Sequence, residues 1–179
     1  MNVLFTVSEC MPFAATGGLA EVAGSLPKQL KKLGANIKVI MPLYKTIYKN
    51  FRDELTFIGK TTTKLAWRNQ YCGLFHKKHQ EIDYYFVDNL YYFDRESLYG
   101  HFDDGERFAF FSKSVFDCIE MIDFIPDIIH CHDHQTALIP VYLDYYKKQQ
   151  KLLHTKSLFT IHNIEYQGIY GMENFGDVF

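Results

Sequence analysis

A short apolar segment followed by a glycine turn constrains the fold of this chain more than any other feature. Residues 3–7 (VLFTV) are apolar, the turn at residues 15–21 (ATGGLAE) contains Gly17 and Gly18, and residues with helical spacing follow. This order predicts a buried strand that passes through the turn into a helix N-terminus. Free N–H groups and the helix dipole there favour an anion, and glycines let a ligand approach the main chain. A tight connection without a ligand is the alternative, because neither G-x-G-x-x-G nor G-x-x-x-x-G-K-[ST] is present.

Beyond this turn, apolar segments alternate with stretches of helical periodicity. The expected strands are residues 3–7, 37–41, 128–131 and 157–161, the expected helices are residues 19–33, 104–122 and 133–148, and antiparallel strands or hairpins are expected at about 55–87. Gly34 is expected to end the first helix. Pro27 is expected either to kink that helix near Gly24 or to lie in the first turn of a second helix capped by Ser25.

Strands that alternate with helices predict a doubly wound, Rossmann-like α/β fold with a mainly parallel sheet covered on both faces. The 179 residues fit a single domain. In such sheets ligands bind beyond the carboxyl ends of the strands, where three polar clusters fall: residues 8–21, 130–135 and 162–168. The aromatic, loop-like residues 88–105 are suited to rim the same pocket.

Charge and cysteine content limit the partners and the compartment that we expect. A formal net charge of -2 provides no basic field, so no nucleic-acid partner is expected. No stretch approaches the roughly 18 apolar residues of a membrane span, so no membrane partner is expected. The four cysteines include no C-x-x-C pair, which favours a reducing compartment and therefore the cytoplasm.

Residues 130–134 (HCHDH) contain the side-chain types that bind zinc. A zinc-dependent hydrolase that uses His130, His132 and Asp133 is one hypothesis, although no second ligand set follows in the sequence. Another is that His130 packs within its strand while Asp133 caps the next helix. The third is a polar pocket without a metal. His162 ends a strand that we expect to be buried, where a satisfied core histidine is the alternative to a functional one.

Three segments of the chain resemble the N-terminal domain of the bacterial glycogen synthase and plant starch synthase family. They are residues 8–13 with 16–22 (SECMPF, TGGLAEV), residues 127–133 (DIIHCHD), and residues 159–163 with 166–168 (FTIHN, YQG). The similarity covers essentially the whole chain. It implies the GT-B fold, in which two Rossmann-like domains face each other across a cleft. Residues 1–179 would form the N-terminal, acceptor-side domain, and the C-terminal nucleotide-binding domain would lie outside this chain.

The resemblance also implies roles for individual residues. His162 matches the family's active-site histidine near the reacting carbon of the transferred glucose, and Asp133 matches an aspartate that lines the sugar pocket. Glu21 matches a donor-site acid that is usually aspartate. The other residues implied to bind substrate are Thr16, Gly17, Gly18, Tyr99, Asn163, Tyr166 and Gln167. The chain departs from the family pattern at Ala15, which is usually lysine, and at His134, which is usually tryptophan.

The resemblance implies that the full-length protein is a retaining hexosyltransferase. It would transfer glucose from ADP-glucose or UDP-glucose to the non-reducing end of an α-1,4-glucan such as glycogen, without a metal or another cofactor. Because the cleft needs both domains, with the chain's own C-terminal domain as partner, we expect the isolated chain to be inactive. Besides the zinc hydrolase, the alternative is a non-catalytic glucan-binding module that uses the aromatic residues 91–102.

Overall fold

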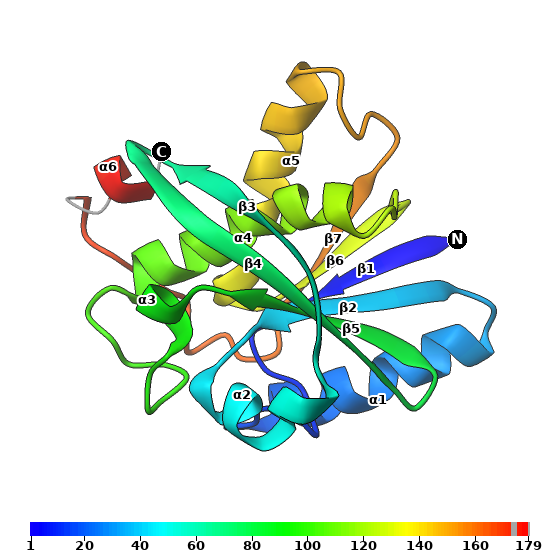
Figure 1. The fold of residues 1–179 in the computed structure, drawn as a ribbon. Helices are drawn as coiled ribbons and strands as arrows, with labels where there is room; N and C mark the ends of the chain where they lie inside the picture. Colours follow the sequence, from blue (N-terminus) through cyan, green and yellow to red (C-terminus); the bar gives the residue numbers. More distant parts are fainter. Residues whose placement is uncertain (173–174, 179) are drawn as a thin grey trace.

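The computed structural model describes residues 1–172 and 175–178 and contains a seven-stranded sheet with the order β3-β4-β5-β2-β1-β6-β7 (Figure 1). The strands are β1 (Asn2–Thr6), β2 (Asn36–Pro42), β3 (Thr56–Leu65), β4 (Arg68–His79), β5 (Ile82–Asp88), β6 (Ile128–His132) and β7 (Lys156–Thr160). The helices are α1 (Gly18–Lys32), α2 (Lys45–Phe51), α3 (Leu90–Phe93), α4 (Asp104–Met121), α5 (Ile139–Lys148) and α6 (Phe175–Val178), with short 3-10 helices η1 (Arg52–Glu54) and η2 (His134–Thr136). No helix in this part of the chain is long and apolar enough to cross a membrane.

The sheet has the doubly wound arrangement that the sequence predicts. Strands β5, β2, β1, β6 and β7 pair in parallel, whereas β4 pairs antiparallel with both β3 and β5. The expected antiparallel excursion at 55–87 therefore corresponds to β3, β4 and β5. The strand order reverses between β1 and β6, since the chain first winds outward through β2 and later returns to the other side of β1. Such a reversal leaves a crevice at the carboxyl ends of the two strands.

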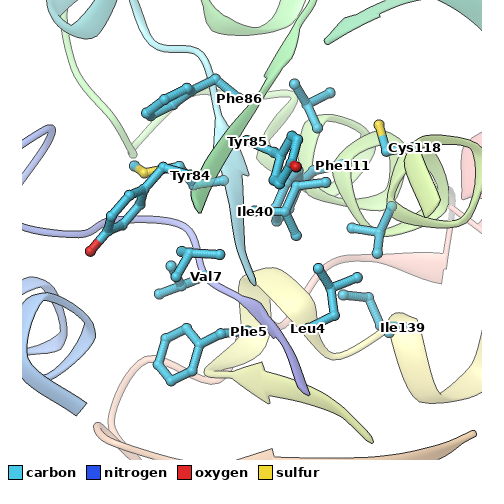
Figure 2. Packing of buried hydrophobic residues seen from close by; sticks show 14 of the residues in the cluster. Leu4, Phe5, Val7, Ile40, Tyr84, Tyr85, Phe86, Phe111, Cys118 and Ile139 are labelled. Atoms are coloured by element: carbon cyan, nitrogen blue, oxygen red, sulfur yellow. The ribbon is translucent and has the colours of Figure 1, made fainter. Parts of the chain in front are cut away.

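Helices cover both faces of the sheet, with α4 and α5 on one face and α1 and α2 on the other (Figure 1). Adjacent residues of β1 therefore both find an apolar environment, because successive side chains of a strand point to opposite faces. Figure 2 shows Leu4 beside Ile139, while Phe5 lies on the opposite side of the strand. All three side chains are fully buried. Burial on both faces explains the continuous apolar run at the start of the sequence.

Helix α1 is one continuous helix, so of the two alternatives expected for Pro27, the second helix capped by Ser25 is wrong. The Ser25 hydroxyl lies within the helix and donates to the carbonyl of Glu21 at 2.9 Å. Pro27 is buried inside the same helix, and Gly34 follows its end with a φ of 90°. A Cβ atom on Gly24 would lie 3.0 Å from Met11. The lack of a side chain at Gly24 thus allows the segment after β1 to pack closely against α1.

Two other expectations near the carboxyl edge of the sheet are also wrong. The helix expected over residues 133–148 is divided into η2 and α5, with Pro140 in the first turn of α5. Strand β7 is the edge of the sheet and not a buried strand, because Leu158 and Phe159 are 50% and 39% exposed. An apolar run indicates burial only when a further element covers it, and local sequence carries no information about that neighbour.

Candidate functional site

A cleft of about 760 Å³ lies where the segments after β1, β6 and β7 meet. It is lined by Glu9, Thr16, Gly17, Gly18, Leu19, Val22, Tyr99, Asp133, His134, Gln135, His162, Asn163 and Tyr166. The three polar clusters identified in the sequence therefore converge at one edge of the sheet. This is the edge at which parallel topology places the carboxyl ends of the strands.

Most of the predicted site residues line this cleft, but two of them do not. Glu21 is exposed on the first turn of α1, outside the residues that line the cleft. Gln167 lines two adjoining cavities, and its amide donates to the carbonyl of Ile164 at 3.0 Å. Ala15, at the position where the family pattern has lysine, is exposed, whereas its neighbour Ala14 is buried.

Asp133 joins the end of β6 to the end of β7. Its carboxylate oxygen Oδ1 accepts hydrogen bonds from the backbone N–H groups of His162 at 2.7 Å and Asn163 at 3.3 Å. Its own N–H donates to the carbonyl of Thr160 at 3.0 Å. The prediction that its side chain caps the following helix is therefore wrong. The carboxylate instead holds the backbone of His162 at the cleft through charge-assisted bonds.

The ring of His162 contacts the buried ring of a second histidine, His132. Its Nε2 lies 2.8 Å from Nδ1 of His132, and the two rings are stacked with their centroids 5.1 Å apart. Nε2 of His130 lies 2.8 Å from the hydroxyl of Thr160. Burial, with repulsion from neighbouring histidines, lowers the pKa of His130 to about 4 and that of His132 to about 2. Both rings are therefore neutral near pH 7.

This geometry does not favour the zinc hydrolase. One ring nitrogen of His130 and one of His132 face other side chains, and Asp133 is bound to backbone N–H groups. Throughout residues 1–172 and 175–178, no group of three His, Cys, Asp or Glu side chains is arranged to hold a metal ion. Residues 130–132 instead form the buried end of β6, whereas Asp133 and His134 line the cleft.

Glu9 is a cleft residue to which sequence reasoning assigned no role. Its side chain is only 3% exposed, and Oε2 accepts hydrogen bonds from both the N–H and the hydroxyl of Thr16, each at 2.6 Å. These two bonds fix the turn that leads into Gly17 and Gly18. An acidic residue just beyond the carboxyl end of a buried strand is the sequence signal that points to it.

The N-terminus of α1 opens into the cleft beside this turn. Gly17 is the extended N-cap residue, and no side chain among the described residues caps this end of the helix. A Cβ atom on Gly18 would meet no atom within 4 Å, so the backbone there is open to a ligand. The first N–H groups of a helix are free to bind an anion.

Tyr99 and His134 complete the rim. The hydroxyl of Tyr99 lies 2.7 Å from that of Ser8, and burial raises the pKa of Tyr99, with a further contribution from the charge of Glu9. Nδ1 of His134 donates to the carbonyl of Tyr166 at 2.9 Å. The loop after β7 is thereby tied to η2, and residues from four parts of the chain form a continuous polar wall.

The fold is a Rossmann-like α/β domain with a polar cleft at the reversal of strand order. The sequence profile of the starch synthase catalytic domain family matches residues 2–179, and the chain belongs to this family. The resemblance seen in the sequence is thus confirmed.

Similar proteins agree with this assignment. The chain is 51% identical over 179 residues to a glycogen synthase of Anoxybacillus flavithermus, with 99% of this chain and 37% of that protein covered. It is 49% identical over 174 residues to a glycogen synthase of Bacillus cereus, with 97% and 37% covered. The catalytic domain of starch synthase IV from Arabidopsis thaliana, bound to ADP and acarbose, has a TM-score of 0.85 at 28% identity, with 99% and 36% covered. The chain therefore spans about 37% of the length of the curated relatives it matches.

Proposed function

We propose that this chain forms one wall of the active site of a glycogen synthase that transfers glucose, with retention, from a nucleotide-activated sugar to the non-reducing end of an α-1,4-glucan. The observation that carries this proposal is the convergence of the glycine turn, Asp133 and His162 around one cleft. The names of the relatives support the reaction. The ADP in the starch synthase structure supports ADP-glucose over UDP-glucose as donor.

In this proposal the cleft supplies one part of the charge stabilisation that such a transfer requires. Retaining transfer passes through an oxocarbenium-like state while a diphosphate departs, so placed charges and dipoles must stabilise both sides of the breaking bond. We assign the sugar side to His162 and the carboxylate of Asp133, which lie together at the ends of β7 and β6. We assign the N–H groups at Gly17 and Gly18 to the anionic or hydroxyl side. The proposed transfer uses no metal or other cofactor.

The remaining predicted residues fit the same proposal as substrate contacts. Thr16, Tyr99, Asn163 and Tyr166 line the cleft beside the proposed reaction centre. The proposal places the nucleotide-binding C-terminal domain across this cleft, in the part of the relatives that the chain does not span. It also places the protein in the cytoplasm, in keeping with four cysteines that are all buried and free.

A chimera tests this proposal. Residues 1–179 would be joined to the remainder of the Anoxybacillus flavithermus glycogen synthase, and the transfer of labelled glucose from ADP-glucose to glycogen would be measured. We expect the chimera to be active, the isolated chain to be inactive, and His162→Ala in the chimera to lower kcat at least about 100-fold. His154→Ala, at an exposed position away from the cleft, is the matched control.

Two outcomes would contradict the proposal. One is glucosyl transfer by the isolated chain at the rate of the chimera. The other is a folded, active chimera whose rate is insensitive to His162→Ala. Binding of maltooligosaccharide that survives His162→Ala and is lost on Tyr99→Ala would instead favour the glucan-binding module.

A further inference from the structure

The ring of His132 lies beneath that of His162, outside the cleft itself. It is fully buried, and its ring centroid is 4.0 Å from that of Phe5, 4.0 Å from that of His130 and 5.1 Å from that of His162. His130 and His132 share one face of β6 because residues two apart in a strand point the same way. Phe5 pairs with His130 across β1 and β6. Strand β6 and the segment after β7 therefore place three imidazoles in a row that ends at the cleft.

Hydrogen bonds hold both the backbone and the ring of His132. Its N–H donates to the hydroxyl of Thr136 at 2.6 Å, and that hydroxyl donates to the carbonyl of His132 at 2.9 Å. Nδ1 of its ring faces Nε2 of His162 at 2.8 Å. The other ring nitrogen, Nε2, is buried and has no hydrogen-bond partner among the described residues. Among the described residues, Nδ1 is therefore the one ring nitrogen of His132 with a hydrogen-bond partner, and that partner is His162.

This arrangement determines which nitrogen of His132 carries the proton. Burial lowers the pKa of His132 to about 2, so near pH 7 the ring is neutral and has a single N–H group. If the proton were on Nε2, a buried donor would be left without an acceptor, which proteins tolerate less often than an unpaired acceptor. With the proton on Nδ1, the donor is satisfied by His162 and only a lone pair remains unpaired.

We propose that His132 is a positioning residue that donates from Nδ1 to Nε2 of His162 and thereby keeps the proton of the His162 ring on Nδ1. The hydrogen bond at one ring nitrogen of a histidine sets the protonation of the other. His162 then presents an N–H donor, suited to an oxygen acceptor of a sugar, in place of a bare lone pair. The consequence for catalysis rests on the proposed function of His162, whereas the tautomer itself does not.

Nuclear magnetic resonance tests the tautomer directly on the chain labelled with ¹⁵N-histidine. Long-range ¹H–¹⁵N correlation spectra show which ring nitrogen carries the proton. We expect His162 to be protonated at Nδ1 in the wild type and to shift toward Nε2–H, the form that free histidine prefers, in His132→Leu. His132→Asn, whose amide keeps a donor near the position of Nδ1, is expected to retain the Nδ1–H form.

His130→Asn is the matched control, because His130 lies on the same face of the same strand but bonds to Thr160. We expect it to leave the tautomer of His162 unchanged. An Nε2–H tautomer in the wild type would overturn the inference, and this result does not depend on whether any variant folds. An unchanged tautomer in folded His132→Leu would also overturn it.

Kinetics of the chimera separate this inference from the proposed function. We expect His132→Leu to lower kcat on the order of 10-fold, with rescue by His132→Asn and with little change for His130→Asn. A tautomer that shifts as expected while kcat stays constant would argue against the catalytic role of His162 and leave the positioning by His132 intact.

Discussion

The buried ring of His130 makes the free energy of unfolding depend on pH in a way that one substitution isolates. Burial, reinforced by repulsion from His162, lowers the pKa of His130 from 6.5 to about 4. At pH 5 the unfolded chain therefore binds a proton at this residue, and the folded protein does not. Protons that bind only the unfolded state stabilise it, so the stability present above pH 6.5 is lost as the pH falls toward 4.

The size of the effect follows from the pKa difference. Below the unfolded pKa of 6.5, each pH unit lowers the free energy of unfolding by about 1.4 kcal/mol. The interval from pH 6.5 to pH 5 is about 1.5 units, so His130 alone lowers the free energy of unfolding by about 2 kcal/mol between pH 7 and pH 5. His130→Asn removes the titrating group and keeps an amide next to the hydroxyl of Thr160. Its packing cost is the same at both pH values and cancels when the pH dependences of the two proteins are subtracted.

Urea unfolding followed by circular dichroism, at pH 7 and at pH 5, measures this difference. We expect the wild type to lose about 2 kcal/mol more than His130→Asn over this range. His154→Asn, at an exposed position, controls for the substitution itself. Equal pH dependence of the wild type and His130→Asn would refute the reasoning, because it would show that His130 binds protons similarly in the folded and unfolded states.

Two substitutions test the segments that close the cleft. Gly168→Ala is expected to cost at least about 1 kcal/mol, because its φ is 63° and a Cβ atom would lie 2.5 Å from the His134 ring. Gly18→Ala, where a Cβ atom meets nothing within 4 Å, is its control, and equal melting temperatures of the two variants would contradict this expectation. Asp133→Asn is expected to cost about 1 kcal/mol and to speed hydrogen exchange at the N–H of His162, since the bond to that N–H loses its charge. Unchanged exchange would argue against this role of Asp133.

Much of the fold was predictable because its signals are local. Apolar runs that alternate with helical periodicity predicted the strands and the parallel sheet, and parallel topology then predicted that the segments after β1, β6 and β7 would meet. The convergence of Gly17, Asp133 and His162 at one cleft follows from that topology. The family resemblance added the roles, which remain proposals.

The sequence by itself determined the order of the elements, because strand and helix periodicity depends on neighbouring residues alone. Only the tertiary structure decided how individual polar groups are satisfied, because their partners lie far away in the chain. Asp133 binds N–H groups 29 and 30 residues further on, and the ring of His132 faces that of His162. Burial of β7 was likewise undecidable from its apolar residues, because burial depends on what packs against a strand and not on the strand itself.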